Sequence, residues 1–552
     1  MSRAFAFPVA RHPWAAVLGA LAVVLALVAV PAPPATLAAD QPRVDAIDPV
    51  LGGVRLQFAT IPEFEAAFDT GQLTSVELTN YYLRRIRALN DRLRAITFTN
   101  PHALRQAAES DLLRRQGVDR GPLEGIPVLF KDNIDTIRPE LDLLPTTAGS
   151  YAMLHSQPAA DAVIVARLRA AGAVILGKTN LSEWAAFRGG LSSGWSAIGG
   201  LTANPYVTDR NACGSSSGSG VAAAAALATV TIGTDTDGSI LCPAGINGLA
   251  GLRPSTGLVS RTGIIPISQF QDTAGPMARN VTDAAIVLSV IDGVDPADPF
   301  TADAAPYVER DYLALLDAGA FAGKRIGIWR RGGNPQVNAV INAAIATLQA
   351  QGATVIDNVP INIGNAQTLE GLVLRHEFKH DINVYLAATP GDHPADLAGL
   401  IAFNEANADV ELLCGNQSIF VAAQATSGDL SDPTYQARRQ TATTLARNGI
   451  DNALANNQLD AIFTAANGPA QLNGVCNVGG TGGVISSAPP AIAGYPAVTV
   501  PAGYSANGLF PIGMQFIGPR WSEDQILSFA YAFEQATLAR RPPEFLPTVP
   551  TP

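Results

Sequence analysis

Residues 221–240 read VAAAAALATVTIGTDTDGSI, and this stretch decides the fold class. Its Ala-rich first half, residues 221–228, predicts a helix, and residues 230–232 predict a short buried strand. The following residues 233–240 predict a loop that presents Ser239 just after the strand. Because helices and strands alternate in the same way along the rest of the chain, we expect an α/β protein.

The neighbouring segments continue this alternation. Thr74 and Glu77 form a capping box that predicts the start of a helix. Residues 161–171 predict a helix closed by Gly172, and residues 174–176 predict a buried strand. Near the end, residues 497–500 and 512–517 predict two paired strands around Asn507-Gly508, and Ser522 predicts the start of a last helix.

The composition limits the classes of function. The chain has 552 residues, of which 47% are hydrophobic and 15% are charged, so it can bury a large core. Its formal net charge is −11 at pH 7. A nucleic-acid-binding protein needs a basic surface to displace counterions, and an acidic surface also disfavours anionic lipid. We therefore expect no nucleic-acid partner.

The first 39 residues have the pattern of a secretory signal peptide. Arg3 and Arg11 give a positively charged start, an apolar stretch follows at residues 14–30, and prolines and small residues come after it. We expect residues 1–39 to be removed and residues 40–552 to form the mature domain, exported to the periplasm or secreted, with no membrane association afterwards. A retained membrane anchor is the alternative, since an apolar stretch of this length is borderline for spanning a bilayer.

Four cysteines fit an exported protein. Disulfides persist in oxidising compartments, and the four residues allow three pairings between which the sequence does not choose. They are Cys213, Cys242, Cys414 and Cys476.

Two motifs match known signatures in their residue types, but the segments around them do not fit those signatures. Residues 172–179 match a phosphate-binding loop, although a helix precedes Gly172 and an apolar strand occupies the middle of the motif. Residues 214–218 match the nucleophile elbow of α/β-hydrolases, but a polar loop precedes them and no His follows His393. We expect neither activity.

Residues 376–380, HEFKH, match the zinc-hydrolase pattern, with His376 and His380 four residues apart on one helix face. Prolines interrupt the segment that would supply a third ligand, and Phe378 lies on an apolar helix face. An ordinary packed helix explains the segment, so no metal is expected, and a zinc metallopeptidase that uses His376 and His380 remains the alternative class of enzyme.

Three other segments together suggest acyl transfer without histidine. Residues 125–133 predict a strand that ends in Lys131, residues 214–218 are rich in Gly and Ser, and the third segment is the loop with Ser239. A neutral Lys131 can take a proton that Ser215 relays from Ser239, and Ser239 can attack a carbonyl carbon. The loop residues Thr236, Asp237, Gly238 and Ser239 could turn backbone N–H groups toward the developing oxyanion.

These segments resemble the amidase signature family in several motifs that occur in the same order. The resemblance covers about residues 55 to 540. The matching residues are Cys213 to Ser219, Gly233 to Pro243, Gly251-Leu252-Arg253-Pro254, Asp272-Thr273-Ala274-Gly275-Pro276, Ala493-Gly494-Tyr495-Pro496 and Gly513 to Gly518.

The resemblance implies a fold and a set of roles. The implied fold is one large domain with a mixed central β-sheet covered by helices, and no cofactor. Ser239 is the implied nucleophile, Ser215 the bridging serine and Lys131 the base, with a cis peptide bond before Ser215. The sequence departs from the family pattern at four positions: glycine is replaced at Cys213, Ser217 and Asp237, and the usual arginine is replaced by Leu241. We expect the side chain of Asp237 to point away from the oxyanion.

Within the family, the sequence is most similar to bacterial peptide amidases, which release ammonia from C-terminal peptide amides. The similarity rests on residues 194–200, 234–239 and 377–381. The expected partner is therefore a peptide amide or another small amide, and a monomer is expected. The alternatives are an amidase for fatty acyl or aryl amides and an exported binding protein without activity.

Overall fold

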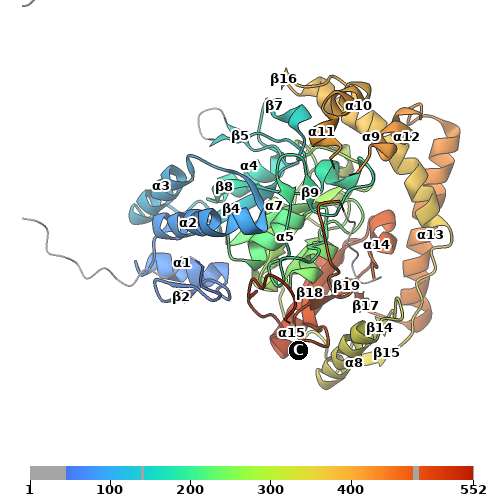
Figure 1. Ribbon diagram of the computed structural model, residues 1–552. Coiled ribbons are helices and arrows are strands. Elements are labelled where there is room, and N and C mark those ends of the chain that lie inside the picture. Colours follow the sequence, from blue (N-terminus) through green and yellow to red (C-terminus); the bar gives the residue numbers. More distant parts are fainter. Residues whose placement is uncertain (1–44, 139–141, 414, 477–483, 551–552) are drawn as a thin grey trace, which may run out of the picture. The chain divides into compact units, whose positions relative to one another are not determined.

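An eleven-stranded mixed sheet runs through the part of the chain that the structure describes, residues 45–138, 142–413, 415–476 and 484–550 of a computed structural model (Figure 1). In order across the sheet, the strands are β15 (Thr354–Ile356), β14 (Arg325–Ile328), β17 (Ala461–Ala465), β19 (Pro511–Ile517), β18 (Ala497–Tyr504), β12 (Ala250–Arg253), β13 (Thr273–Ala278), β11 (Val230–Asp235), β4 (Pro127–Lys131), β8 (Val174–Thr179) and β3 (Ile96–Thr99).

The strands β11, β4 and β8 form a parallel group, and every residue of the three is buried. Continuous burial is typical of parallel strands covered on both faces, and it explains why these strands read as short apolar runs in the sequence. β13 pairs antiparallel with β11. Because parallel strands end at the same edge of a sheet, the loops after β4 and β11 emerge side by side.

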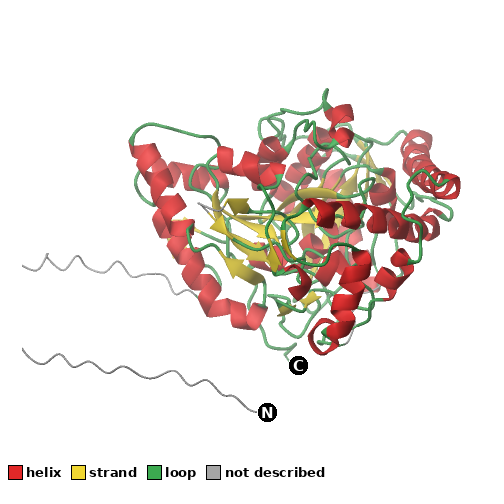
Figure 2. Cartoon of the chain, turned by 90° about the horizontal axis from the view of Figure 1, so that it is seen from above, coloured by secondary structure: helices red, strands yellow, loops and turns green. Residues whose placement is uncertain are grey.

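Helices lie on both sides of the sheet (Figure 2). They are α1 (Ile61–Asp69), α2 (Ser75–Leu93), α3 (Ala103–Arg115), α4 (Val163–Ala170), α5 (Ser217–Ala224), α6 (Leu241–Ile246), α7 (Val281–Ile291), α8 (Pro335–Ala350), α9 (Ala366–Ala388), α10 (Leu397–Ala406), α11 (Ala408–Glu411), α12 (Ser418–Gln424), α13 (Pro433–Asn457), α14 (Ala488–Ala493) and α15 (Glu523–Thr537).

Small two-stranded pairs complete the described structure. They are β1 (Val50–Leu51) with β2 (Val54–Arg55), β5 (Ile137–Arg138) with β6 (Asp142–Leu143), β7 (His155–Ser156) with β16 (Gly391–Asp392), and β9 (Trp195–Ser196) with β10 (Gly200–Leu201). The expected α/β class, with one large domain built on a mixed sheet, is confirmed.

One helix differs from its predicted position. α5 begins at Ser217 and ends at Ala224, whereas the Ala-rich pattern predicts residues 221–228. The early start depends on Gly218, where a Cβ atom would lie 2.4 Å from the carbonyl oxygens of Ala95 and Asn180. Only glycine lets the first turn pack this closely on neighbouring backbone. The early end coincides with Ala226, whose φ of 51° lies in the left-handed region.

Other expected elements are confirmed. Thr74 and Glu77 form the capping box of α2, with the Glu77 amide donating to the Thr74 hydroxyl at 3.1 Å. β18 and β19 pair around Asn507-Gly508 as expected. α15 starts after Ser522, but the Ser522 hydroxyl donates to the Pro519 carbonyl at 2.7 Å and caps no helix amide.

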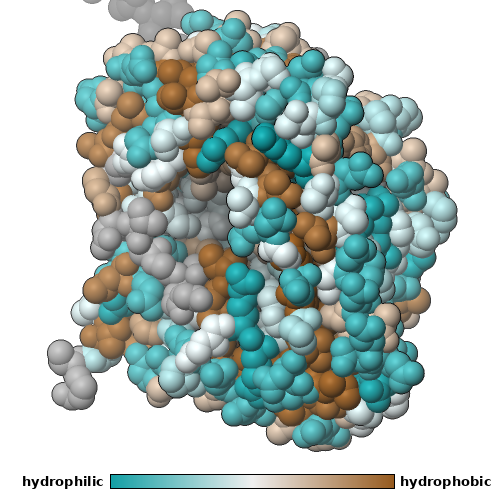
Figure 3. All heavy atoms as spheres, turned by 90° about the vertical axis from the view of Figure 1, so that its right-hand side faces the viewer, coloured by the Kyte–Doolittle hydropathy of each residue, from teal (hydrophilic) through white to brown (hydrophobic). Residues whose placement is uncertain are grey.

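The expected signal peptide at residues 1–39 lies outside the described residues. Among the described residues, no helix combines the length and the apolar character that crossing a bilayer requires. The face formed by α9, α12 and α13, seen from the right of Figure 1, mixes hydrophilic and apolar residues (Figure 3).

Candidate active site

Lys131 is the last residue of β4, and its side chain is fully buried. Its Nζ lies 2.7 Å from the Ser215 Oγ, 2.8 Å from the Thr234 Oγ1 and 3.3 Å from the Thr234 carbonyl oxygen. The Asn133 side chain donates to the same Thr234 hydroxyl at 3.1 Å. The lysine singled out from the sequence therefore contacts two hydroxyls and a carbonyl.

The surroundings of Lys131 favour its neutral form. Burial lowers its pKa from 10.5 to about 7, and the negative charges of Asp235 and Asp272 oppose part of this effect. A pKa near 7 leaves a substantial neutral fraction at neutral pH, and a neutral amine can accept a proton. The position is therefore chemically suited to a general base.

The Ser215 segment lies directly against the Ser239 segment. The peptide bond between Gly214 and Ser215 is cis. The Ser182 amide donates to the Ser215 carbonyl at 3.0 Å, and the Ser216 amide donates to the Ser239 carbonyl at 3.2 Å. The structure thus brings together Lys131, Ser215 and Ser239 from three separate parts of the sequence.

The Asp235 carboxylate holds the loop that carries Ser239. It accepts hydrogen bonds from the amides of Gly238 at 2.8 Å and Ile240 at 2.7 Å. The buried Arg253 forms an ion pair with it at 2.7 Å and also donates to its backbone carbonyl at 2.7 Å. A charged carboxylate with several donors is a strong anchor, so it fixes the path of the chain on both sides of Ser239.

The same contacts decide which loop amides are free. The Gly238 amide is engaged by Asp235, whereas the amides of Asp237 and Ser239 have no acceptor among the described residues. The Thr236 side chain points to Asp272, to which it donates at 2.5 Å. Of the expected oxyanion residues, Thr236, Asp237 and Ser239 therefore keep backbone amides without an acceptor among the described residues, and Gly238 does not.

The carboxylate of Asp237, which replaces a glycine of the family pattern, is held by the residue that precedes α14. The Ser487 hydroxyl donates to it at 2.6 Å, and burial raises its pKa. Glu370 lies close by on α9, and burial together with the charge of Asp237 raises the Glu370 pKa to about 9. The Asp237 side chain thus has a partner of its own beside the oxyanion loop.

A disulfide joins the two serine segments. Cys213 and Cys242 are bonded, 29 residues apart in the sequence. Cys213 immediately precedes the Gly214–Ser215 bond, and Cys242 lies in α6 just after Ser239. The sequence left this pairing open. Cys476 is also disulfide-bonded.

The polar side chains of the zinc motif, His376, Glu377 and His380, contact other residues of the protein. Glu377, its central carboxylate, is buried, ion-paired with Arg439 and hydrogen-bonded to Tyr435 at 2.7 Å. His376 lies 3.1 Å from the Ser427 hydroxyl, and His380 lies 2.7 Å from Asp381. Among the described residues, no group of three or more His, Cys, Asp or Glu side chains could hold a metal ion.

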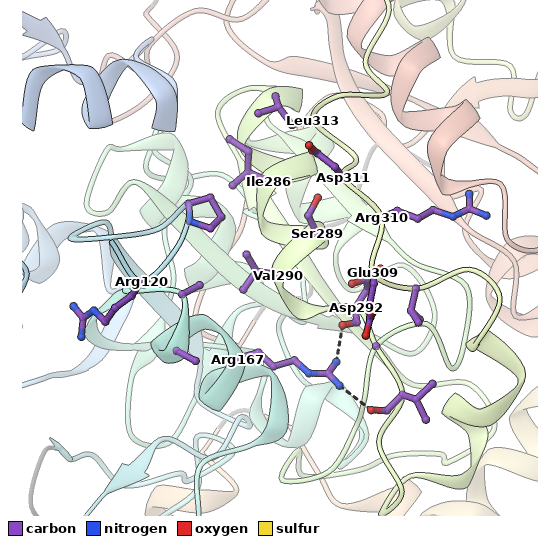
Figure 4. A pocket seen from close by; sticks show the side chains of 16 residues that line it. Arg120, Arg167, Ile286, Ser289, Val290, Asp292, Glu309, Arg310, Asp311 and Leu313 are labelled. Carbon is purple, nitrogen blue, oxygen red and sulfur yellow. Dashed lines mark hydrogen bonds between the residues drawn. The ribbon is translucent and has the colours of Figure 1, made fainter. Parts of the chain in front are cut away.

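A cavity of about 840 Å³ lies elsewhere, at the end of α7 (Figure 4). One of its cations, Arg167, donates to the carbonyls of Ile291 at 2.9 Å, Asp292 at 2.8 Å and Val294 at 2.9 Å. Neither Lys131 nor the two serines line this cavity. This arginine is thus used to satisfy the carboxyl end of the helix.

Sequence reasoning missed several residues that build the site. Thr234 and Asp235 belong to the matching segment Gly233 to Pro243. The sequence did not predict that Thr234 would contact Lys131 or that Asp235 would contact Arg253. Ser487 carried no signal at all, because its contact with Asp237 joins residues 250 positions apart. One local feature did indicate Thr234 and Asp235: they are the last two residues of the strand β11, and both are polar.

Comparisons with known proteins show the family to which the chain belongs. The family described as Amidase matches residues 77–527. The native peptide amidase from Stenotrophomonas maltophilia, a solved structure, has a TM-score of 0.82 and 47% sequence identity, covering 88% of this chain and 98% of that chain.

Two relatives in sequence carry different names. A protein of Arabidopsis thaliana named "Probable amidase" is 42% identical over 501 residues, which cover 89% of this chain and 92% of the relative. A glutamyl-tRNA(Gln) amidotransferase subunit from Chloroflexus aggregans is 34% identical over 516 residues, which cover 87% of this chain and 97% of the relative. With a family match over most of its length, the chain belongs to the amidase signature family and is an amidase.

Proposed function

We propose that this amidase hydrolyses the C-terminal amides of peptides, releasing ammonia, through Ser239, Ser215 and Lys131. The observation that carries the mechanism is the fully buried Lys131 amine, 2.7 Å from the Ser215 hydroxyl and with a pKa lowered to about 7. No cofactor is part of the proposal.

The contacts of Lys131 suit a neutral amine. Its two N–H bonds match the two acceptors of Thr234, the hydroxyl and the carbonyl oxygen. Its lone pair is then directed to the third contact, the Ser215 hydroxyl, which becomes the proton donor. In this arrangement Lys131 can take a proton from Ser215 while Ser215 takes one from Ser239.

The reaction then follows acyl-transfer chemistry. Ser239 Oγ attacks the amide carbon as its proton passes to Ser215, and the oxyanion accepts hydrogen bonds from the free amides of Asp237 and Ser239. The leaving nitrogen takes a proton back through Ser215 and departs as ammonia, which leaves an ester on Ser239. A water molecule attacks this ester by the same proton path and releases the peptide acid.

Two observations support peptide amides as substrates. The peptide amidase from Stenotrophomonas maltophilia is 47% identical to this chain. The Gly- and Ser-rich residues 189–220, which lead to Ser215, offer many backbone groups, and an extended peptide can pair with such groups as an added strand does. A fatty acyl chain would instead need a continuous apolar groove.

The export of the mature residues 40–552, as a monomer in the periplasm or outside the cell, is part of this proposal. The bond between Cys213 and Cys242 supports it, because structural disulfides are typical of oxidising compartments. Terminal sequencing of the protein recovered from the exported fraction tests it, and a chain that keeps residues 1–39 would contradict it.

The substrate is tested by measuring ammonia release from a dipeptide amide, a fatty amide and an aryl amide under identical conditions. We expect the highest kcat/KM for the dipeptide amide, and mass spectrometry should show little cleavage of internal peptide bonds. A far higher kcat/KM for the fatty or the aryl amide would reject the peptide specificity and leave the mechanism intact. The Ser239→Ala variant provides the blank.

A further inference from the structure

A second cavity, of about 470 Å³, lies between the end of α14 and the helix α13. Neither Lys131 nor the two serines line it. Arg447 on α13 and Arg520, which follows β19, both line it. Phe270 and Phe300 form an aromatic part of the wall, with ring centroids 5.2 Å apart. The cavity thus combines two cations with an apolar surface.

The two arginines have unused hydrogen-bond donors. Arg447 donates through Nε to the Ala493 carbonyl at 3.0 Å, and its terminal nitrogens have no acceptor among the described residues. The Nε of Arg520 is buried without a partner among the described residues. Its terminal nitrogen lies 3.6 Å from the carboxylate of Asp303, whose side chain is 74% exposed. Unsatisfied guanidinium donors at a cavity wall are costly unless a ligand or water accepts from them.

The charges in this cavity are unbalanced. Burial and the positive charge of Arg447 both lower the pKa of Arg520. A third arginine in the wall, Arg439, is already neutralised by its ion pair with Glu377. Among the described residues that line the cavity, Arg447 and Arg520 therefore face only the exposed carboxylate of Asp303. The cavity carries an excess of positive charge that an anion would neutralise.

We propose that this cavity binds an organic anion, whose carboxylate or phosphate lies between Arg447 and Arg520 and whose apolar body packs on Phe270 and Phe300. Two guanidinium groups provide planar pairs of donors that match the oxygens of either group. Thr443 adds a hydroxyl from the same face of α13, one turn before Arg447. The site is distinct from the proposed catalytic centre, so it does not depend on the mechanism above.

Binding can be measured by thermal melting and calorimetry on the purified full chain with sodium phenylacetate or inorganic phosphate, at constant ionic strength set with chloride. We expect at least one of the two anions to raise Tm at millimolar concentrations. In the double variant Arg447→Gln/Arg520→Gln, the affinity should fall by roughly tenfold or more, since charge-assisted hydrogen bonds are lost. The larger effect with phenylacetate or with phosphate identifies which anion the site prefers.

The matched control is Arg438→Gln, which removes an exposed arginine from the same helix and should bind both anions as the unmodified protein does. If the double variant does not fold, Arg520→Lys decides, because it keeps the charge but loses the planar pair of donors. Affinity should then fall several-fold. An unchanged affinity in either variant, or no binding of phenylacetate or phosphate to the unmodified protein, overturns the proposal.

Discussion

The regions around Lys131 and Lys178 are neighbours in the sheet but differ in chemistry. Both lysines are fully buried on adjacent parallel strands, where Phe130 of β4 pairs with Lys178 of β8. Lys178 donates to the Ile134 carbonyl and to the Thr146 hydroxyl, and it lies 3.8 Å from the carboxylate of Asp132.

The difference shows that burial alone does not make a lysine a base. Burial lowers the pKa of both lysines. Around Lys178, the carboxylates of Asp132 and Asp135 oppose this effect at close range, and Tyr385 ties Asp135 to α9 through a hydrogen bond of 2.9 Å. Both lysines contact hydroxyls, but Lys178 also lies within ion-pair distance of a carboxylate, whereas Lys131 has no such ion pair among the described residues. The partner groups decide that one lysine suits catalysis and the other suits structure.

The largest effect is expected from a substitution of Ser239, the proposed nucleophile in the region around Lys131. Ser239→Ala should lower kcat by about 10⁴–10⁶-fold, as losses of a nucleophile do, because no other group can form the acyl-enzyme. Intact-mass measurement after treatment with a phosphonate inhibitor should show one adduct on the unmodified protein and none on the variant. Peptide mapping that places the adduct on Ser215 would refute the role of Ser239.

Lys131→Arg should lower kcat by about 10²–10⁴-fold, the contribution typical of a general base, because a guanidinium stays charged and cannot accept a proton. Steady-state kinetics on a peptide amide measure this, with a thermal melt to show that the variant is folded. Full activity in a folded Lys131→Arg variant would remove Lys131 from the mechanism.

In the region around Lys178, where a carboxylate lies beside the lysine, a substitution should change the stability of the protein. Lys178→Met should lower the free energy of unfolding by about 3–5 kcal/mol, because it leaves Asp132 buried without its positive partner. Denaturant unfolding measures this change. Asp132→Asn in the same background should restore part of the stability, and the absence of any rescue would show that the pair is not what Lys178 stabilises.

The pH dependence separates the two lysines further. With a Lys131 pKa of about 7, kcat/KM should rise about tenfold per unit below pH 7 and level off above it, since only the neutral amine is a base. Between about pH 7 and 10.5 the unfolded chain carries a proton on Lys131 that the folded chain has lost, so stability should rise with pH in that window. Lys131→Met should lack this rise. A profile of kcat/KM that is flat from about pH 5 to 8 contradicts the prediction.

The smallest effect is expected at His380, for which no contact with either lysine is found among the described residues. His380→Ala should change kcat by less than about threefold, because His380 is half-exposed and contacts Asp381 rather than the proposed site, as is usual for a surface substitution. Activity after dialysis against a strong chelator is the second measurement. A loss that zinc restores would revive the metallopeptidase alternative.

Much of the fold could be predicted from local patterns in the sequence. The strands β4, β8 and β11 appear in the sequence as short apolar runs, and β4 and β11 end in polar residues at the site, Lys131 and Asp235. The start of α5 could not be read in this way, since it depends on how closely Gly218 approaches backbone from two other segments. The approach of one segment to another is not encoded in the pattern of either.

The sequence by itself determined the α/β class and the segments that carry Lys131, Ser215 and Ser239, because periodicity and turn chemistry act over a few residues. Only the tertiary structure decided which partner each polar group has. It paired Cys213 with Cys242 and Asp235 with Arg253, and it bound the zinc motif's Glu377 to an arginine. These pairings follow from the order of the strands and the packing of the helices on them, since a buried charge is tolerated only where the fold supplies its partner.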